Sequence, residues 1–153
     1  MTDRPLSFLQ RKNLPHTVPH WVSGRPTYFI TICCKDRSND ELLRAGRAEK
    51  LVESVKFYQG RQKWWSHLFV VMPDHVHGLF VFSEEVPFTK TIAAWKSFHT
   101  HNSRIAWQDG FFEHRIRGAA EFGEKSAYIR HNPVRAKLVT VVEEWPHFYE
   151  GLD

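Results

Sequence analysis

The sequence predicts an α+β fold, in which helices cover one face of an antiparallel sheet. Three observations lead to this class. Strand-like and helix-like segments alternate in the order β-α-β-β-α-β-α, a short turn separates two of the strand-like runs, and 42% of the 153 residues are apolar. A chain of this length forms one domain, which hides roughly two-thirds of the surface that its unfolded chain would expose.

The first half of the chain holds an irregular arm, a strand and a helix. Residues 1–26 contain four prolines, which break any helix, and several basic side chains. The β-branched and aromatic run Thr27–Cys34 predicts a strand. In residues 47–65, apolar side chains recur at spacings of three and four, which predicts an amphipathic helix with its end near Gly60. Residues 27–153 are expected to form the folded domain.

The second half supplies a hairpin, two helices and a further strand. The hairpin is expected where the turn residues Pro73 and Asp74 separate two strand-like runs. Because Pro133 disfavours helical geometry at the residue before it, the last helix should end or restart at Asn132. The expected elements are strands at His67–Met72, His75–Phe82 and Phe111–Arg117, and helices at 88–107 and from Ala120 towards Asn132. This order is close to the split βαβ, or ferredoxin-like, pattern.

The distribution of charge is more informative than the net charge of +4, which allows a polyanionic partner without requiring one. Residues 138–153 hold four acids and no Lys or Arg, whereas the arm, the second helix and the region around Tyr128 are basic. No run approaches the roughly 20 apolar residues that span a bilayer, so we expect no membrane association. The only cysteines are the neighbours Cys33 and Cys34. Such a pair is a poor disulfide, which favours a reducing interior, the cytoplasm.

The segment MPDHVHGLFVF holds two histidines at the spacing of a metal site. Side chains alternate along a strand, so His75 and His77 point to the same face, about 7 Å apart along it. Two imidazoles so placed can bind one divalent metal, and Gly78 beside them would let a ligand approach the backbone closely. In a chain with ten histidines such a pair also arises by chance, so the spacing alone leaves a pair without metal equally open.

The run EKSAYIRHNPVRAKLV places a candidate nucleophile and a candidate metal ligand on one helix face. Tyr128 and Asn132 are separated by one helical turn. Tyrosine becomes a useful nucleophile when a metal or cations stabilise the phenolate or the charge on the group it attacks. The amide oxygen of Asn132 is a candidate third ligand, with His131 and Glu124 as alternatives. Taken alone, Tyr128 is more typical of a core tyrosine, and Asn132 can be the N-cap of a new helix that begins at Pro133.

With these segments assembled, the chain resembles the REP-associated tyrosine transposases, a branch of the single-tyrosine HUH transposases. The matching stretches are RKNLPHTVPHW, PTYFITI, VVMPDHVHGLFVF, WKSFHTHNSRI and YIRHNPVRAKLV, in the family's order. The HUH motif (histidine, hydrophobic residue, histidine) is His75-Val76-His77. Asp74 departs from the pattern, because the family commonly has Asn before the first histidine.

The resemblance implies a ferredoxin-like, RRM-like domain that cuts and rejoins single-stranded DNA at hairpins of repetitive extragenic palindromes, with the bacterial nucleoid as its place of work. Tyr128 would attack a phosphodiester and form a 5′-phosphotyrosine, while His75, His77 and Asn132 would hold Mg²⁺ or Mn²⁺. Two imidazoles ordinarily suit a softer ion than magnesium, which makes Mn²⁺ the physical compromise. The resemblance favours a monomer and leaves a dimer open.

Basic residues of the arm, the second helix and the Tyr128 region are candidate DNA contacts, because cationic grooves track the backbone of single strands. They are Arg4, Arg11, Lys12, His16, His20, Lys96, Arg104, Arg115, Arg117, Arg130 and Arg135. Two other functions stay open on the sequence. A non-catalytic binder of structured nucleic acid would keep the fold and the charge. A metallohydrolase of small phosphoesters would use His75 and His77 with water as its nucleophile.

Overall fold

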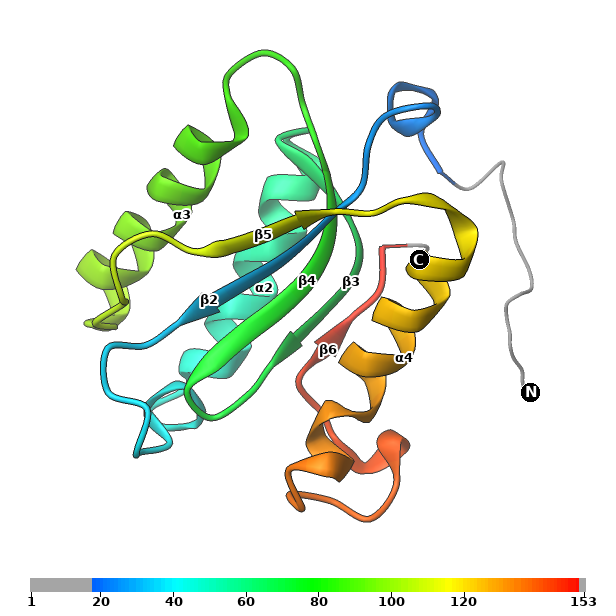
Figure 1. Ribbon diagram of the computed structural model, residues 1–153. Helices are drawn as coiled ribbons and strands as arrows, with labels where there is room; N and C mark the ends of the chain where they lie inside the picture. The colour runs from blue at the N-terminus through cyan, green and yellow to red at the C-terminus, as the bar shows by residue number, and fades with distance from the viewer. Residues whose placement is uncertain (1–17, 152–153) are drawn as a thin grey trace.

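Five antiparallel strands form one sheet in the order β5-β2-β4-β3-β6 in the computed structural model, which describes residues 18–151 (Figure 1). The strands are β2 (Tyr28–Cys33), β3 (Trp64–Val71), β4 (His75–Phe82), β5 (Phe112–Arg115) and β6 (Phe148–Tyr149). The α-helices are α2 (Arg47–Gly60), α3 (Phe88–Ser103) and α4 (Gly118–Arg135), and the short 3₁₀ helices are η2 (His20–Val22), η3 (Glu41–Leu43) and η4 (Val142–Glu144). The predicted α+β class and the antiparallel sheet are confirmed.

Helices cover both faces of this sheet, whereas the sequence had suggested only one (Figure 1). On one face, Leu51 of α2 and Trp95 of α3 share a core with Ile30 of β2. On the other face, Ile129 of α4 shares a core with Phe29 of β2. The reason lies in β3 and β4, which are buried at all but one position each and therefore need cover on both faces.

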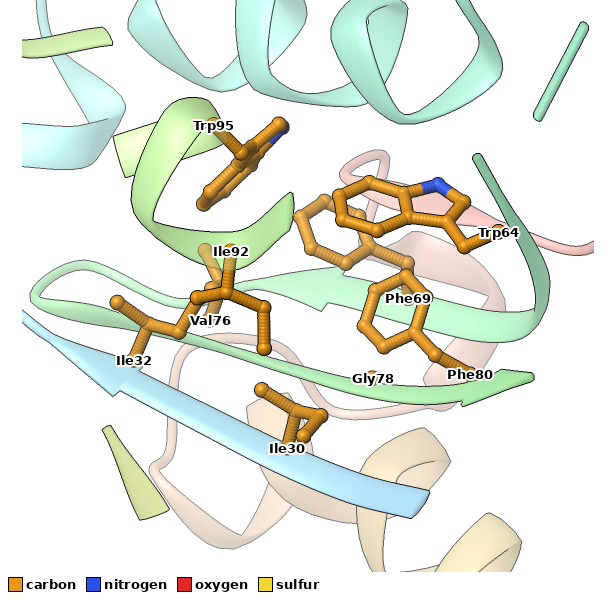
Figure 2. A pocket seen from close by; sticks show the side chains of 9 residues that line it. All are labelled: Ile30, Ile32, Trp64, Phe69, Val76, Gly78, Phe80, Ile92 and Trp95. Atoms are coloured by element: carbon orange, nitrogen blue, oxygen red, sulfur yellow. The ribbon is translucent and has the colours of Figure 1, made fainter. Parts of the chain in front are cut away.

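Aromatic rings fill the core between the sheet and the helices α2 and α3. Figure 2 shows Trp64, Phe69 and Phe80 in this core, with Gly78 of β4 beneath the ring of Phe80. A side chain at Gly78 would collide with that ring. Gly78 thus makes room for core packing, on the face away from the histidines, and the expectation that it serves a ligand is wrong. The residues drawn enclose only about 10 Å³ of free space, which leaves room for no more than about one water molecule.

The helix α4 runs unbroken through Pro133 over its 18 residues. The expectation that it ends or restarts at Asn132 is therefore wrong, and Asn132 is not an N-cap. Pro133 lies in the last turn, where its missing N–H removes one hydrogen bond. Its carbonyl oxygen still accepts a hydrogen bond from the backbone N–H of Leu138, at 2.9 Å. The continuous helix keeps Arg135 in phase with Tyr128.

Several other boundaries and one strand differ from expectation, and β5 is shorter than expected. The helix α3 ends at Ser103 rather than at residue 107, because Arg104 adopts the left-handed conformation, with φ 58°. The strand β3 begins at Trp64 rather than at His67, because α2 ends at Gly60 as predicted. The strand β6 was not expected, since two residues are too few to show an alternating pattern. None of the helices in the described part of the chain is long and apolar enough to cross a membrane.

His99 of α3 gives the fold a pH-dependent part of its stability. Its Nε2 atom lies 2.7 Å from Oγ of Ser54 in α2, and its ring lies 4.8 Å from that of Trp95. Burial lowers the pKa of His99 from 6.5 to about 4. Below pH 6.5 the His99 imidazole therefore binds a proton in the unfolded chain but not in the folded protein. The free energy of unfolding falls as the pH drops towards 4.

We expect protonation of His99 to lower the free energy of unfolding by at most about 3 kcal/mol. Above pH 6.5 it should have no effect, because the imidazole is neutral in both the folded and the unfolded state. The measurement is urea unfolding from pH 4 to pH 7.5. His99→Gln should be less stable at neutral pH and should show a flatter stability profile between pH 6.5 and pH 4. A slope equal to that of the wild type in this window would contradict the assignment.

Candidate active site

The strand β4 presents His75 and His77 on the face that α4 covers. Their Nε2 atoms lie 3.1 Å apart, facing each other. Both Nδ1 atoms have oxygen partners, since His75 Nδ1 lies 2.7 Å from Oδ1 of Asp74 and His77 Nδ1 lies 2.8 Å from Oγ1 of Thr31. When both Nδ1 atoms donate protons to these oxygens, both Nε2 lone pairs are directed at one point. This is the usual arrangement by which a protein orients metal-binding histidines.

Burial keeps the two imidazoles in the neutral form that binds metals. It lowers the pKa of His77 to about 3, and the charges of His75 and Arg37 add to the effect. Burial also lowers the pKa of His75, although the hydrogen bond to the Asp74 carboxylate opposes it. For Asp74 itself, burial acts to raise the pKa, but hydrogen bonds from Arg37 and His75 outweigh it and hold the pKa below its ordinary value.

The helix α4 brings Tyr128 and Asn132 to the histidine pair. The Tyr128 ring lies 5.4 Å from the ring of His77 and 6.1 Å from that of Phe29, centroid to centroid. The Asn132 side chain, one turn further along, interacts with His75. Tyr128 is 39% exposed, so it is not a core tyrosine. Its ring is held against the sheet at a place that a macromolecular substrate can reach.

The donors at this place fit one divalent cation. They are two imidazole nitrogens that converge and an amide oxygen from Asn132 beside them, a mixed set that intermediate ions such as Mn²⁺ accept. Within residues 18–151, no three His, Cys, Asp or Glu side chains gather so that they could hold a metal. The alternatives His131 and Glu124, both exposed on α4, therefore do not complete the pair, and Asn132 remains the candidate third ligand.

Cationic side chains surround the tyrosine and the histidines. The guanidinium carbon of Arg135 lies 5.7 Å from the centre of the Tyr128 ring, and Nζ of Lys125 lies 5.1 Å from the centre of the Phe29 ring. Arg37 donates from Nε to Oδ2 of Asp74 at 2.7 Å. Cations placed around a nucleophile can stabilise the negative charge that develops when it attacks a phosphate.

Comparisons with known proteins lead to one group. Over 130 residues the chain is 26% identical to the REP-associated tyrosine transposase of Escherichia coli (strain K12), with 83% of this chain and 77% of that protein covered. Over 137 residues it is 25% identical to a putative REP-associated tyrosine transposase of Haemophilus influenzae, with 78% of this chain and 77% of that protein covered. The chain is similar in sequence to the REP-associated tyrosine transposases. No protein-family model matches it.

A solved structure of a REP-associated tyrosine transposase bound to a REP hairpin has the same fold. It superposes with a TM-score of 0.71 at 26% sequence identity, over 80% of this chain and 75% of that one. The resemblance on which the sequence interpretation rested is thereby confirmed in sequence and in fold. The roles of individual side chains stay predictions.

Two of the expected DNA contacts lie far from the candidate site. Lys96 sits on α3, which covers the opposite face of the sheet, and its Nζ donates to the carbonyl oxygens of Gln108 and Gly110 at 2.9 and 2.6 Å. Arg104 is the exposed residue that ends the same helix. The structure does not bring either residue to Tyr128, and Lys96 holds a loop in place.

The remaining basic candidates are divided between the site and other surfaces. Arg135 is at the site, whereas Arg130 forms an ion pair with Glu150 at 2.5 Å. Arg115 lines an open groove of about 540 Å³ between residues 24–27 and the start of α4, and Arg117 is the N-cap residue of that helix. His20 is exposed in η2, and Arg4, Arg11, Lys12 and His16 lie outside the described residues.

Thr31 and Arg37 lie at the site although the sequence did not predict them as part of it. Thr31 reaches His77 because β2 and β4 pair in a register that places the two residues directly opposite each other. Arg37 lies in the loop after β2 and reaches the site through Asp74. The pairing of two strands distant in the sequence is not visible in a single chain, so only the alternation within β2 hinted at Thr31.

Proposed function

We propose that the protein cuts and rejoins single-stranded DNA beside a REP-type hairpin, with Tyr128 as its nucleophile. The observation that carries this proposal is the meeting of Tyr128 with the histidine pair, its ring 5.4 Å from that of His77. The Asn132 side chain, one turn further along α4, interacts with His75. A relative with the same fold is known bound to a REP hairpin, which supports the choice of substrate.

The proposed reaction is a phosphoryl transfer to tyrosine. Oη of Tyr128 forms a bond to the phosphorus of a DNA phosphodiester and loses its proton, and the bond from phosphorus to the 3′ oxygen breaks. The products are a 5′-phosphotyrosine and a 3′-OH, which takes up the proton. The energy of the broken bond stays in the phosphotyrosine, so a second 3′-OH can reverse the step without ATP. The Arg135 guanidinium beside the ring would stabilise negative charge that develops on the attacked phosphate.

His75, His77 and Asn132 hold Mg²⁺ or Mn²⁺ in this proposal. Such an ion, when bound, polarises the scissile phosphate. The contribution of the chain is orientation, because Asp74 and Thr31 engage both Nδ1 atoms and leave both Nε2 atoms to the ion. Since the tyrosine and both histidines meet within one chain, we propose that a monomer is the active unit, acting at the bacterial nucleoid.

An adduct assay tests the proposal. The protein is incubated with Mn²⁺ and a REP-type DNA hairpin that carries a single-stranded flank, and the products are separated in SDS. We expect a covalent protein–DNA complex that EDTA prevents and that an unstructured strand of the same composition does not form. A non-catalytic binder would give salt-sensitive binding without any complex. A metallohydrolase of small phosphoesters would instead hydrolyse an aryl phosphate and form no adduct. Binding without a covalent complex, or hydrolysis without an adduct, would contradict the proposal.

A further inference from the structure

We propose that Arg37 binds a backbone phosphate of the DNA strand that occupies the candidate active site. The inference rests on the proposed function and adds to it a phosphate-binding residue on the sheet side of the site. Arg37 lies in the loop between β2 and η3, outside every basic segment that the sequence pattern singled out. Its position, its anchoring and its exposure carry the inference.

The carboxylate of Asp74 fixes Arg37 to the histidine pair. Its Oδ2 accepts a hydrogen bond from Nε of Arg37, and its Oδ1 lies against Nδ1 of His75, both at 2.7 Å. The anchor is itself held, because the backbone carbonyl of Asp74 accepts a hydrogen bond from the N–H of Cys34 at 2.9 Å. An arginine held in this way has already lost much of its side-chain freedom, so a ligand that it binds need not order it.

The remaining donors of Arg37 are open to a ligand. The Arg37 side chain is 47% exposed, whereas that of Asp74 is only 15% exposed. Among residues 18–151, its terminal nitrogens have no hydrogen-bond acceptor; the contact to Asp74 uses Nε. A role limited to neutralising Asp74 would be met by that contact alone, with the rest of the guanidinium left over.

The Arg37 charge acts on the same place as the candidate metal ligands. Burial is the main cause that lowers the pKa of each histidine, and the Arg37 charge acts in the same direction on both. Lys125 and Arg135 flank the site from α4. A strand laid over the histidines would thus meet cations from the sheet side and from the helix side.

A phosphodiester is the ligand that this arrangement suits. The planar guanidinium offers paired donors that match two oxygens of a phosphate, and it keeps its charge at any pH where the protein is folded. The histidine pair and Tyr128 define where the scissile phosphate lies in the proposed function. Arg37 is joined to that place through one carboxylate, so the phosphate it meets is the scissile one or its immediate neighbour.

A thermodynamic cycle tests the inference by binding alone. All proteins carry Tyr128→Phe, so that no DNA is cut. The Kd is measured for a REP-type hairpin with a single-stranded flank, and for a series in which each flank phosphate in turn is an uncharged methylphosphonate. We expect Arg37→Gln to weaken binding by about tenfold. We also expect one methylphosphonate position that weakens binding to the protein with Arg37 to have no effect on Arg37→Gln.

Arg44→Gln is the matched control, because Arg44 is an exposed arginine of the same region that pairs with Asp40 at 3.0 Å. In Arg44→Gln, each methylphosphonate position should change the Kd as much as it does in the protein that keeps both arginines. If every methylphosphonate position changes the Kd of Arg37→Gln as it does that of the protein with Arg37, the inference is wrong while the proposed function stands. If the double variant Arg37→Gln/Asp74→Asn binds like the protein with both residues, Arg37 only neutralises Asp74 and the inference is again wrong. If no hairpin binds to any of the proteins, both the inference about Arg37 and the proposed function are wrong.

Discussion

Tyr128→Phe is expected to abolish the covalent protein–DNA complex and to leave hairpin binding close to that of the wild type. The substitution removes only the hydroxyl that would attack the phosphate. The ring keeps its contacts with His77 and Phe29. Because the side chain is partly exposed, stability should change by no more than about 0.5 kcal/mol. The complex is measured in SDS gels and binding by fluorescence anisotropy.

Tyr58→Phe is the control for this experiment. Tyr58 lies on α2, where its ring packs 4.8 Å from that of Trp64 on the opposite side of the sheet. This variant should form the covalent complex as the wild type does. A complex of undiminished yield with Tyr128→Phe would show that another residue, or water, is the nucleophile.

His77→Gln is expected to reduce the affinity for Mn²⁺ by more than about 100-fold and to stop cleavage. Its Nε2 is one of the two nitrogens that converge at 3.1 Å, so the variant leaves a single imidazole at the site. The affinity is measured from the paramagnetic resonance signal of free Mn²⁺, and folding is checked by thermal unfolding because His77 is only 5% exposed.

Two further variants keep this prediction testable should His77→Gln fail to fold. Thr31→Val removes the partner of His77 Nδ1 and should weaken Mn²⁺ binding by roughly 10- to 100-fold. His67→Gln removes a histidine of β3 whose ring packs 5.2 Å from that of Phe122, and it should leave the affinity unchanged. An affinity that is the same in Thr31→Val, His67→Gln and the wild type would show that the pair is not the metal site.

Local periodicity predicted the parts of the candidate site that lie on single elements. The period of two along β4 placed His75 and His77 on one face, and the helical period placed Tyr128 and Asn132 one turn apart. The structure has both arrangements. These relations depend only on backbone geometry, which is the same in every strand and helix.

The relations between elements were beyond a single sequence. Both faces of β3 and β4 are apolar, so the sequence did not indicate which face α4 would cover. Pro133 seemed to end that helix, but it lies buried in the last turn, where its missing N–H removes only one hydrogen bond. Thr31 and Arg37 depend on strand register and on a loop, neither of which leaves a periodic signal.

Charge counting likewise does not separate cations that hold the fold together from cations that are available to DNA. Lys96 and Arg130 both looked like candidates for phosphate binding. In the structure the first is tied to two loop carbonyls and the second to Glu150. Arg37, which no basic cluster contains, keeps donors open beside the histidines.

The decisive measurement is to locate the DNA on the protein. The covalent complex formed with Mn²⁺ and the hairpin is digested with trypsin and nuclease, and the modified peptide is sequenced by mass spectrometry. We predict a nucleotide joined through its 5′ phosphate to Tyr128. A nucleotide joined to any other residue, or through its 3′ phosphate, would contradict the proposed function, and so would the absence of any modified peptide.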